Sequence, residues 1–163
     1  MEGIIFIGIQ ASGKSSFYLK RFFQTHLRLN LDMLRTRNRE RILLRACIQA
    51  QQPVVIDNTN PTGADRADYI RAFKDGGFRV RGFYFQSALP ECLARNRLRK
   101  KREKIPDAAL FSTFKRLELP GYEEGFDALY HVQLADDDFV VVDWQADIRY
   151  PASPDCNPIG EDP

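Results

Sequence analysis

Near its N-terminus the chain carries a glycine-rich segment of the pattern G-x-x-x-x-G-K-S, which runs from Gly8 to Ser15. The segment follows an apolar run typical of a buried strand and precedes residues that favour a helix, which is the context that this pattern requires. Glycines at both ends let the backbone approach a phosphate closely, because no Cβ stands in the way. The loop N–H groups and the helix N-terminus can then bind phosphate oxygens. The segment therefore predicts a phosphate-binding loop (P-loop) for a nucleoside triphosphate.

Individual residues of this loop have separate expected roles. Lys14 places a point charge on the β- and γ-phosphates, and the Ser15 hydroxyl is a ligand for Mg²⁺. ATP, or another nucleoside triphosphate, and Mg²⁺ are the expected cofactors. The residues of the segment that we expect to bind the nucleotide are Gly8, Ala11, Ser12, Gly13, Lys14, Ser15 and Ser16.

A second pair with chemical potential, Asp32 and Arg35, follows the short alternating run 27–31. In open α/β sheets, ligands bind at the carboxyl ends of the strands. Three residues apart on a helical turn, both side chains face the same way. Asp32 could accept the proton of an attacking hydroxyl, and Arg35 could hold a neighbouring phosphate. An N-cap aspartate followed by a surface arginine is the alternative interpretation.

Asp57 ends the apolar run 54–56 and begins a polar segment. A carboxylate in this place orients Mg²⁺ in many nucleotide-binding folds. An acid in this place can also stabilise its own loop by local hydrogen bonds. Ser15 and Asp57 are therefore the candidate metal residues, and both roles remain open for Asp57.

The basic segment 95–104 is expected to continue a helix that begins at Pro90. Arg95 and Arg99 are four residues apart, so on a helix they share a face while Arg97 points elsewhere. Two guanidinium groups on one face can close on the phosphates of a nucleotide and neutralise the charge that develops during transfer. A solvated basic face is the alternative.

Strands and helices alternate along the rest of the chain. We expect strands at 4–7, 27–31, 54–56, 79–85, 131–134 and 139–142, and helices at 16–26, 38–52, 65–75, 90–104 and 106–117. This alternation predicts an α/β fold with a mainly parallel sheet and helices on both faces. One domain is expected over 1–150, followed by a flexible, proline-rich tail over 151–163.

Composition limits the class of protein. A chain of 163 residues, 44% of them apolar, is long enough for one globular domain with a real core. It contains no apolar run of the roughly 18–20 residues that a membrane span needs, and its start is not typical of a signal peptide. The three cysteines show no C-x-x-C spacing, which favours a reducing, cytoplasmic setting without a disulfide framework or zinc site.

Charge is distributed unevenly. Residues 1–117 hold 23 Lys and Arg against 10 Asp and Glu, whereas residues 118–163 hold one basic residue and 12 acidic ones. So basic a body is typical of a protein that binds a polyanion. A solvated surface with an acidic C-terminal region folded against it is the alternative.

Taken in order, these motifs resemble the 5′-polynucleotide kinase module of phage, bacterial and animal end-healing enzymes. The resemblance covers roughly residues 3–132 and includes the P-loop, Asp32-x-x-Arg35, the run V-V-I-D-N-T-N-P and the R-x-x-x-R of the basic segment. The run Asp57–Pro61, with Glu124-Gly125-Phe126 far downstream, is especially similar to the kinase domain of animal polynucleotide kinase/phosphatases.

The resemblance implies a kinase-type P-loop NTPase in three layers, with a helical basic lid at about 90–106. It implies transfer of the ATP γ-phosphate to the 5′-OH end of DNA or RNA, so that a nucleic acid 5′ end is the expected partner and no membrane is involved. By the resemblance, Asp32 is the general base and Arg35 holds the acceptor phosphate. Lys14 and Ser15 are the P-loop pair, and Arg95 and Arg99 are the lid arginines that contact ATP. The predicted catalytic residues are Asp32, Lys14, Arg35 and Arg99.

The chain departs from this family in two respects. Where related P-loops commonly carry a further glycine, or proline and glycine, this sequence has Gln10-Ala11. The chain also leaves no room for a fused phosphatase or ligase domain, so 3′-end healing is not expected. Two other functions fit the same motifs: a P-loop kinase for a small hydroxyl compound such as a nucleoside, sugar or antibiotic, and a non-catalytic nucleotide-binding module that switches a partner.

Overall fold

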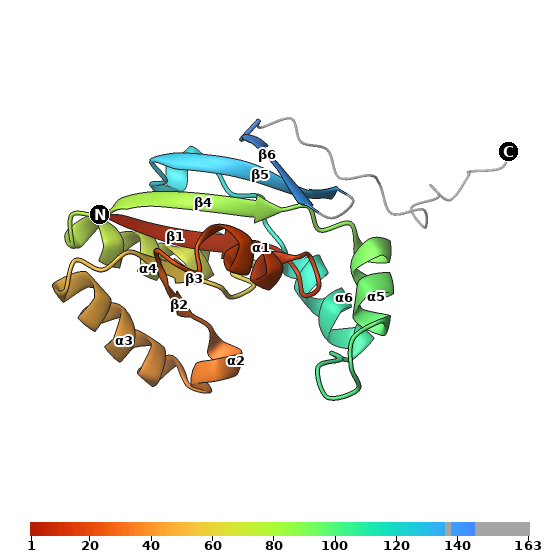
Figure 1. Ribbon diagram of the computed structural model, residues 1–163. Coiled ribbons are helices and arrows are strands. Elements are labelled where there is room, and N and C mark those ends of the chain that lie inside the picture. Colours follow the sequence, from red (N-terminus) through yellow and green to blue (C-terminus); the bar gives the residue numbers. More distant parts are fainter. Residues whose placement is uncertain (136–137, 146–163) are drawn as a thin grey trace, which may run out of the picture.

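A six-stranded sheet forms the centre of the computed structural model, which describes residues 1–135 and 138–145 (Figure 1). The strands are β1 (Glu2–Ile7), β2 (Leu27–Leu29), β3 (Val54–Ile56), β4 (Arg79–Phe85), β5 (Ala128–Ala135) and β6 (Asp138–Asp143). Their order in the sheet is β2-β3-β1-β4-β5-β6. All neighbouring strands are parallel except β5 and β6, which are antiparallel. The predicted mainly parallel sheet is confirmed.

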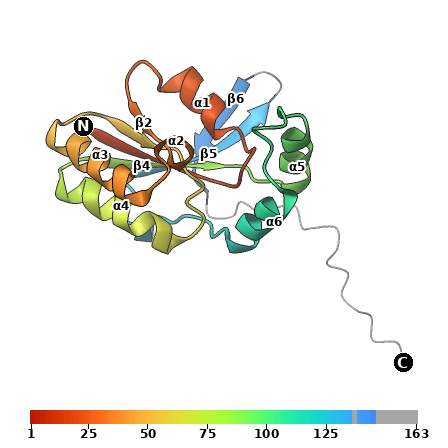
Figure 2. The same ribbon diagram turned by 90° about the horizontal axis from the view of Figure 1, so that it is seen from below.

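Helices cover both faces of this sheet. They are α1 (Lys14–Arg21), α2 (Leu31–Leu34), α3 (Arg37–Gln49), α4 (Gly63–Asp75), α5 (Leu89–Arg97) and α6 (Asp107–Arg116), with a 3₁₀ turn η1 (Tyr122–Glu124). Figure 2 shows α1 on one face and α3 and α4 on the other, which gives the three layers. The helices α5 and α6 lie beyond the carboxyl ends of the strands, next to the P-loop (Figure 1). No helix of the described part of the chain is long and apolar enough to cross a membrane.

Strand β1 supplies core residues to both faces, because successive side chains of a strand alternate. Ile4 and Phe6 pack on the α1 side, and Ile5 and Ile7 pack on the side of α3 and α4. The α1 side is mostly aromatic: rings with centroids 5.1–6.1 Å apart come from Phe6, Phe17, Phe22, Phe83 and Phe85. This aromatic packing fixes α1, and with it the helix N-terminus that the P-loop uses.

Two of the helices, α1 and α3, leave apolar residues exposed. Helix α1 ends at Arg21, five residues earlier than predicted, and Leu19 and Phe23 are 61% and 63% exposed. The chain leaves the helix at Phe22, which turns in towards the rings of the α1 side. In α3, Ile42 and Leu43 are exposed. The helix instead buries the row at positions 40, 44 and 47, which begins with a hydrogen-bonded glutamate that an apolar pattern cannot reveal.

Except for the helix predicted at 90–104, which ends at Arg97, the remaining predicted elements are found with small shifts of their ends. β3 and β4 have the predicted bounds, and α4 ends at Asp75, before two glycines. Pro106 is the N-cap of α6 rather than its first residue. The predicted tail 151–163 and two of the three aspartates of the β5–β6 turn, at 136 and 137, lie outside the described residues.

A buried arginine joins α4 to the loops beside the site. Arg66 is 1% exposed, and its guanidinium binds both carboxylate oxygens of Glu124, at 2.6 and 2.7 Å. It also donates to the carbonyl oxygens of Asn60, Pro61 and Glu118. A single side chain therefore holds the loop after β3, the segment after α6 and the turn η1 together.

Replacing Arg66 should lower the free energy of unfolding more than replacing a surface arginine of the same helix. Arg66→Met leaves the mostly buried Glu124 carboxylate, 16% exposed, without its partner and three carbonyls without a donor, so we expect a loss of about 3–5 kcal/mol in the free energy of unfolding. The control is Arg71→Met, because the Arg71 side chain is 69% exposed and pairs with exposed Asp68, for an expected change within about 0.5 kcal/mol. Urea denaturation measures both, and equal losses would contradict the structural role of Arg66.

Candidate active site

The P-loop joins β1 to α1 with the backbone geometry that its glycines permit. Gly8 and Gly13 have φ angles of 148° and 99°, which L side chains rarely adopt. A Cβ at Gly8 would lie 3.2 Å from the carbonyl oxygen of Phe85. Ala11 takes a left-handed φ of 61° without being glycine, so the departure at Gln10-Ala11 still leaves a closed loop. The Gly8 N–H donates to the carbonyl of Thr59, which ties the loop to the segment after β3.

Lys14 lies folded inside this loop. Its ammonium donates to the carbonyl oxygens of Gly8 and Ile9 at 2.8 and 2.6 Å, and to the Ser12 hydroxyl at 3.3 Å. Burial lowers the pKa of Lys14 to about 8, and the nearby carboxylate of Asp57 opposes this change. The charge that should meet the phosphates is thus held at the centre of the loop, ready to exchange carbonyl partners for phosphate oxygens.

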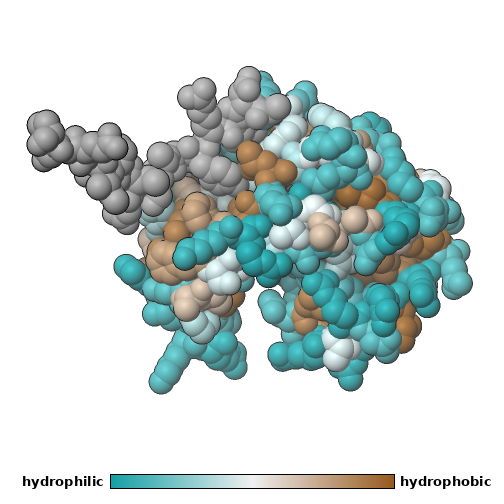
Figure 3. Space-filling view, turned by 180° about the vertical axis from the view of Figure 1, so that it is seen from behind, coloured by the Kyte–Doolittle hydropathy of each residue, from teal (hydrophilic) through white to brown (hydrophobic). Residues whose placement is uncertain are grey.

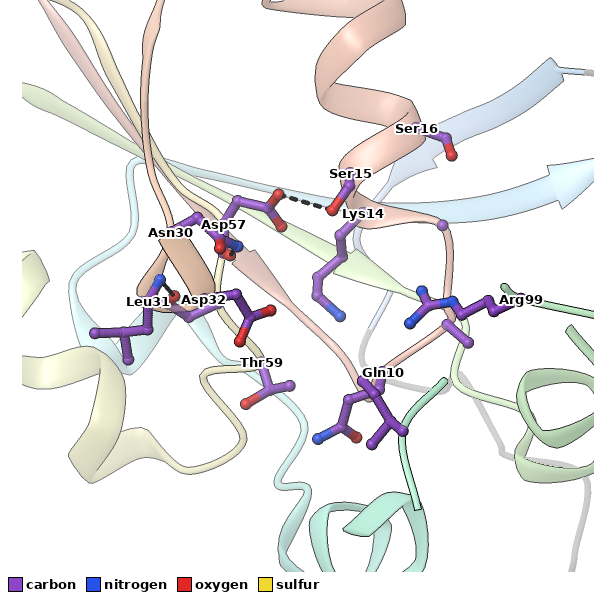
Figure 4. Close-up of a pocket in the computed structure, with 14 residues that line it drawn as sticks. Gln10, Lys14, Ser15, Ser16, Asn30, Leu31, Asp32, Asp57, Thr59 and Arg99 are labelled. Carbon is purple, nitrogen blue, oxygen red and sulfur yellow. Dashed lines mark hydrogen bonds between the residues drawn. The ribbon is translucent and has the colours of Figure 1, made fainter. Parts of the chain in front are cut away.

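A cavity of about 430 Å³ opens in front of the P-loop (Figure 4). Asp32 and Arg99 face this cavity from opposite sides, with the Lys14 ammonium between them. The cavity is lined by Gln10, Ala11, Gly13, Lys14, Ser15, Ser16, Asn30, Leu31, Asp32, Asp57, Asn58, Thr59, Arg99 and Ile105. In the space-filling view a notch separates the α5–α6 end of the molecule from the rest (Figure 3). The structure therefore brings the predicted base, the P-loop lysine and one predicted lid arginine to one space.

Two asparagines hold Asp32 at this cavity. The Asn30 side chain accepts from the N–H of Met33 as the N-cap of α2, and its amide donates to the carbonyl of Asp57. The Leu31 N–H donates to the side-chain oxygen of Asn58. Because β2 and β3 are parallel neighbours, both contacts join the carboxyl ends of adjacent strands. Asp32, in the first turn of α2, is thereby fixed relative to the P-loop.

The carboxylate of Asp57 meets Ser15 and a residue that we did not predict. It accepts from the Ser15 hydroxyl at 3.1 Å and from Nε of Arg28 at 2.7 Å. Its carboxylate thus turns towards the P-loop rather than along its own loop, which favours the first of the two roles considered above. Hydroxyl and carboxylate oxygens suit Mg²⁺, which binds few protein ligands and completes its shell with phosphates and water. Ser15 and Asp57 fit a magnesium ion bound with a nucleotide.

The structure corrects the predicted lid. Helix α5 ends at Arg97, so Arg95 and Arg99 do not share a helical face. Arg95 lies against the P-loop backbone, where its Nε donates to the Ala11 carbonyl at 2.8 Å. Arg99 follows the helix and lines the cavity. The rest of the basic run forms a loop over 98–104, which Asn96 closes by hydrogen bonds with the backbone of Ile105 in both directions.

The predicted pairing of Asp32 with Arg35 is also wrong in its geometry. Helix α2 ends at Leu34, and Arg35 is its C-cap with a left-handed φ of 70°. Arg35 is exposed and is not among the residues that line the cavity. A four-residue helix is too short for the i to i+3 spacing to align the two side chains.

Sequence reasoning missed the polar residues that support the site from behind. The Asn58 amide donates to buried Glu40, and the Tyr69 hydroxyl donates to the same carboxylate at 2.8 Å. The Asn60 amide donates to the carbonyl of Phe6, directly before the P-loop. The only local signal was the pair of asparagines, Asn58 and Asn60, shortly after β3, since Glu40 and Tyr69 look like ordinary helix residues.

Comparison with known proteins identifies the family of this chain. Residues 4–120 match the family described as AAA domain. The chain belongs to this family of P-loop domains. A bifunctional polynucleotide phosphatase/kinase of Schizosaccharomyces pombe is 31% identical over 134 residues, which cover 77% of this chain and 32% of that protein. The chain therefore spans about a third of the length of the curated relative it matches.

Solved structures share the fold. A gluconokinase from Sinorhizobium meliloti aligns with a TM-score of 0.60 and 18% identity over 83% of both chains. A chain of the Pnkp1/Rnl/Hen1 RNA repair complex aligns with a TM-score of 0.59 and 21% identity, covering 71% of this chain and 43% of that one. The fold is thus the kinase-type P-loop fold that the sequence predicted.

The lowered pKa of Lys14 predicts that nucleotide binding depends on pH. The charged ammonium is the form that binds phosphate, and its pKa in the free protein is about 8. As the pH rises through this value the lysine loses its proton, so affinity should fall roughly tenfold between about pH 7.5 and about pH 9. Titration calorimetry with ADP measures this fall. Lys14→Arg keeps its charge over the whole range, and a matching slope in that variant would contradict the assignment.

Proposed function

We propose that this domain is an ATP-dependent polynucleotide 5′-hydroxyl kinase, which transfers the γ-phosphate of ATP to the 5′-OH end of DNA or RNA. One observation carries the proposal: Asp32, Lys14 and Arg99 face a single cavity in front of the P-loop. The 31% identity to a polynucleotide phosphatase/kinase supports the choice of acceptor. The strongly basic composition of residues 1–117 supports it independently, since a polynucleotide is a polyanion.

In this proposal each residue acts at a stated atom. The P-loop N–H groups and the Lys14 ammonium bind the β- and γ-phosphate oxygens. Ser15 and Asp57 would hold the magnesium ion, which neutralises part of the charge of the phosphates. The 5′-oxygen of the acceptor forms a bond to the γ-phosphorus, the bond from that phosphorus to the bridging oxygen of ADP breaks, and ADP leaves. The Asp32 carboxylate accepts the proton of the 5′-hydroxyl. Arg99 stabilises the charge on the γ-phosphate oxygens in transit.

The remaining predicted arginines take different parts. Arg95 already donates to the P-loop carbonyl of Ala11, so it supports the loop that binds the nucleotide. Arg35 is exposed three residues after Asp32, where it could bind a phosphate of an acceptor that extends beyond the cavity. We assign Arg35 to the acceptor and Arg99 to the donor.

Removing the proposed base should stop transfer without affecting the fold. Asp32→Asn keeps the shape of the side chain but cannot accept the proton, so we expect kcat to fall by roughly 10²–10⁴. The Kd for ATP should change little, because Asp32 acts on the acceptor. The assay is labelling of 5′-OH oligonucleotides, DNA and RNA side by side, with γ-labelled ATP. Near-normal turnover by Asp32→Asn would show that another group takes the proton.

The competing function is a kinase for a small hydroxyl compound, which the fold of the gluconokinase makes worth testing. The same enzyme is offered nucleosides, sugars and aminoglycosides in place of an oligonucleotide. For a single-stranded acceptor we expect the logarithm of the affinity to fall with the logarithm of the salt concentration, with a slope of about −0.7 for each phosphate contacted. Turnover of a small neutral acceptor with no oligonucleotide labelling would replace our proposal. ATP binding without any transfer would indicate a nucleotide-binding module.

Arg99 should matter for rate and not for stability. It is exposed and lies outside the helices, so its removal opens no cavity in the core. We expect Arg99→Ala to lower kcat by roughly 10³-fold or more, with an unchanged melting temperature. Arg97→Ala is the control, because Arg97 is also exposed but does not line the cavity. Equal losses in both variants would contradict a specific role for Arg99.

A further inference from the structure

Arg28 occupies the place where the nucleotide's metal ion is expected. It is the middle residue of β2, and its Nη2 lies 2.5 Å from Oδ2 of Asp57 and 2.8 Å from the Ser15 hydroxyl. Its Nε contacts the same Asp57 oxygen at 2.7 Å. The guanidinium therefore bridges the two side chains that we assign to magnesium. Nothing in the P-loop pattern calls for an arginine at this position.

Burial makes this contact more than a surface ion pair. The Asp57 side chain is 1% exposed and that of Arg28 is 23% exposed. A carboxylate removed from water needs a positive partner, and in the part of the chain that the structure describes Arg28 is the cation in direct contact with it. The guanidinium also lies over the ring of Tyr18, 5.5 Å from its centroid, which fixes its position from α1. Asp57 thus has a built-in counter-charge.

The same arrangement sets a competition. A guanidinium and a divalent cation would both be attracted by the Asp57 carboxylate, and next to it they would repel each other. We propose that Arg28 stands in for the divalent cation at the Ser15–Asp57 pair, so that it permits nucleotide binding without metal and limits how strongly metal improves that binding. Arg28 is in this view a positioning residue that sets the metal dependence of the site. The inference rests on the proposed binding of a magnesium nucleotide at the P-loop.

Nucleotide affinity with and without metal tests this role directly. The dissociation constant of ADP is measured by calorimetry in EDTA and in saturating Mg²⁺, for the wild type and for Arg28→Gln. The variant leaves Asp57 as an uncompensated negative charge near the phosphates. We therefore expect the ratio of the two constants, EDTA over Mg²⁺, to rise at least about tenfold over the wild-type ratio. Arg45→Gln, at an exposed position of α3, should keep the wild-type ratio.

Two more variants separate charge from structure. Arg28→Lys keeps a cation beside Asp57 and should return the ratio to within a few-fold of the wild type. Arg28→Gln combined with Asp57→Asn removes both charges, so metal-free binding should recover relative to Arg28→Gln alone. If Arg28→Gln does not fold, the double variant is compared with Asp57→Asn alone, where the remaining Arg28 cation should make metal-free ADP binding tighter than in the double variant. Near-UV circular dichroism checks the fold of each variant.

The outcomes distinguish this inference from the proposed function. An unchanged ratio in Arg28→Gln, with a lowered melting temperature, would mean that the ion pair is only structural and would overturn the inference while leaving the kinase proposal intact. A wild-type protein that binds no ADP under either condition would overturn both. A raised ratio that Arg28→Lys reverses supports the role of Arg28.

Discussion

The site depends on the loop that follows β3, because its hydrogen bonds fix the P-loop and the Asp32 segment relative to each other. Thr59 accepts from the N–H of Gly8, and the Asn60 amide donates to the carbonyl of Phe6, so the loop holds the start of the P-loop. Asn58 accepts from the N–H of Leu31, which begins the short helix that carries Asp32. Phosphoryl transfer needs its groups in fixed positions more than it needs covalent chemistry. These contacts set the distance between the phosphate donor and the proposed base.

The polar support behind this loop is buried and connected. Asn58 reaches Glu40, which also accepts from Tyr69, and burial raises the pKa of the Tyr69 hydroxyl above its ordinary value. Arg66 and Glu124 hold the other end of the same loop. A satisfied buried network rigidifies its surroundings, whereas one missing partner is costly. The run Asp57–Asn60 therefore serves mainly to hold the P-loop and the segment with Asp32 rigidly relative to each other.

At the floor of the cavity, the charges of Lys14 and Asp57 are each paired with groups of the protein itself. Lys14 is folded onto loop carbonyls, and Asp57 is paired with Arg28. Both charges have protein partners, and in the proposed function a magnesium nucleotide replaces them. The free site therefore avoids a bare buried charge, and binding becomes an exchange of partners rather than the filling of an unpaired site. Arg99, in the loop that follows α5, brings a third charge from the opposite side of the cavity.

The sequence by itself determined the P-loop, the parallel sheet and the place of Asp32, because these depend on contiguous residues and on alternation along single strands. Glycines at fixed offsets and runs such as Val54–Ile56 carry that information locally. Only the tertiary structure decided that Arg28 pairs with Asp57, that Arg99 rather than Arg95 lines the cavity, and that Arg66 holds Glu124. Each of these depends on where a helix ends or on which distant segments become neighbours. The order β2-β3-β1 brings Arg28 and Asp57 together across 29 residues of chain, and helical spacing could not foresee that Asn96 would stop α5.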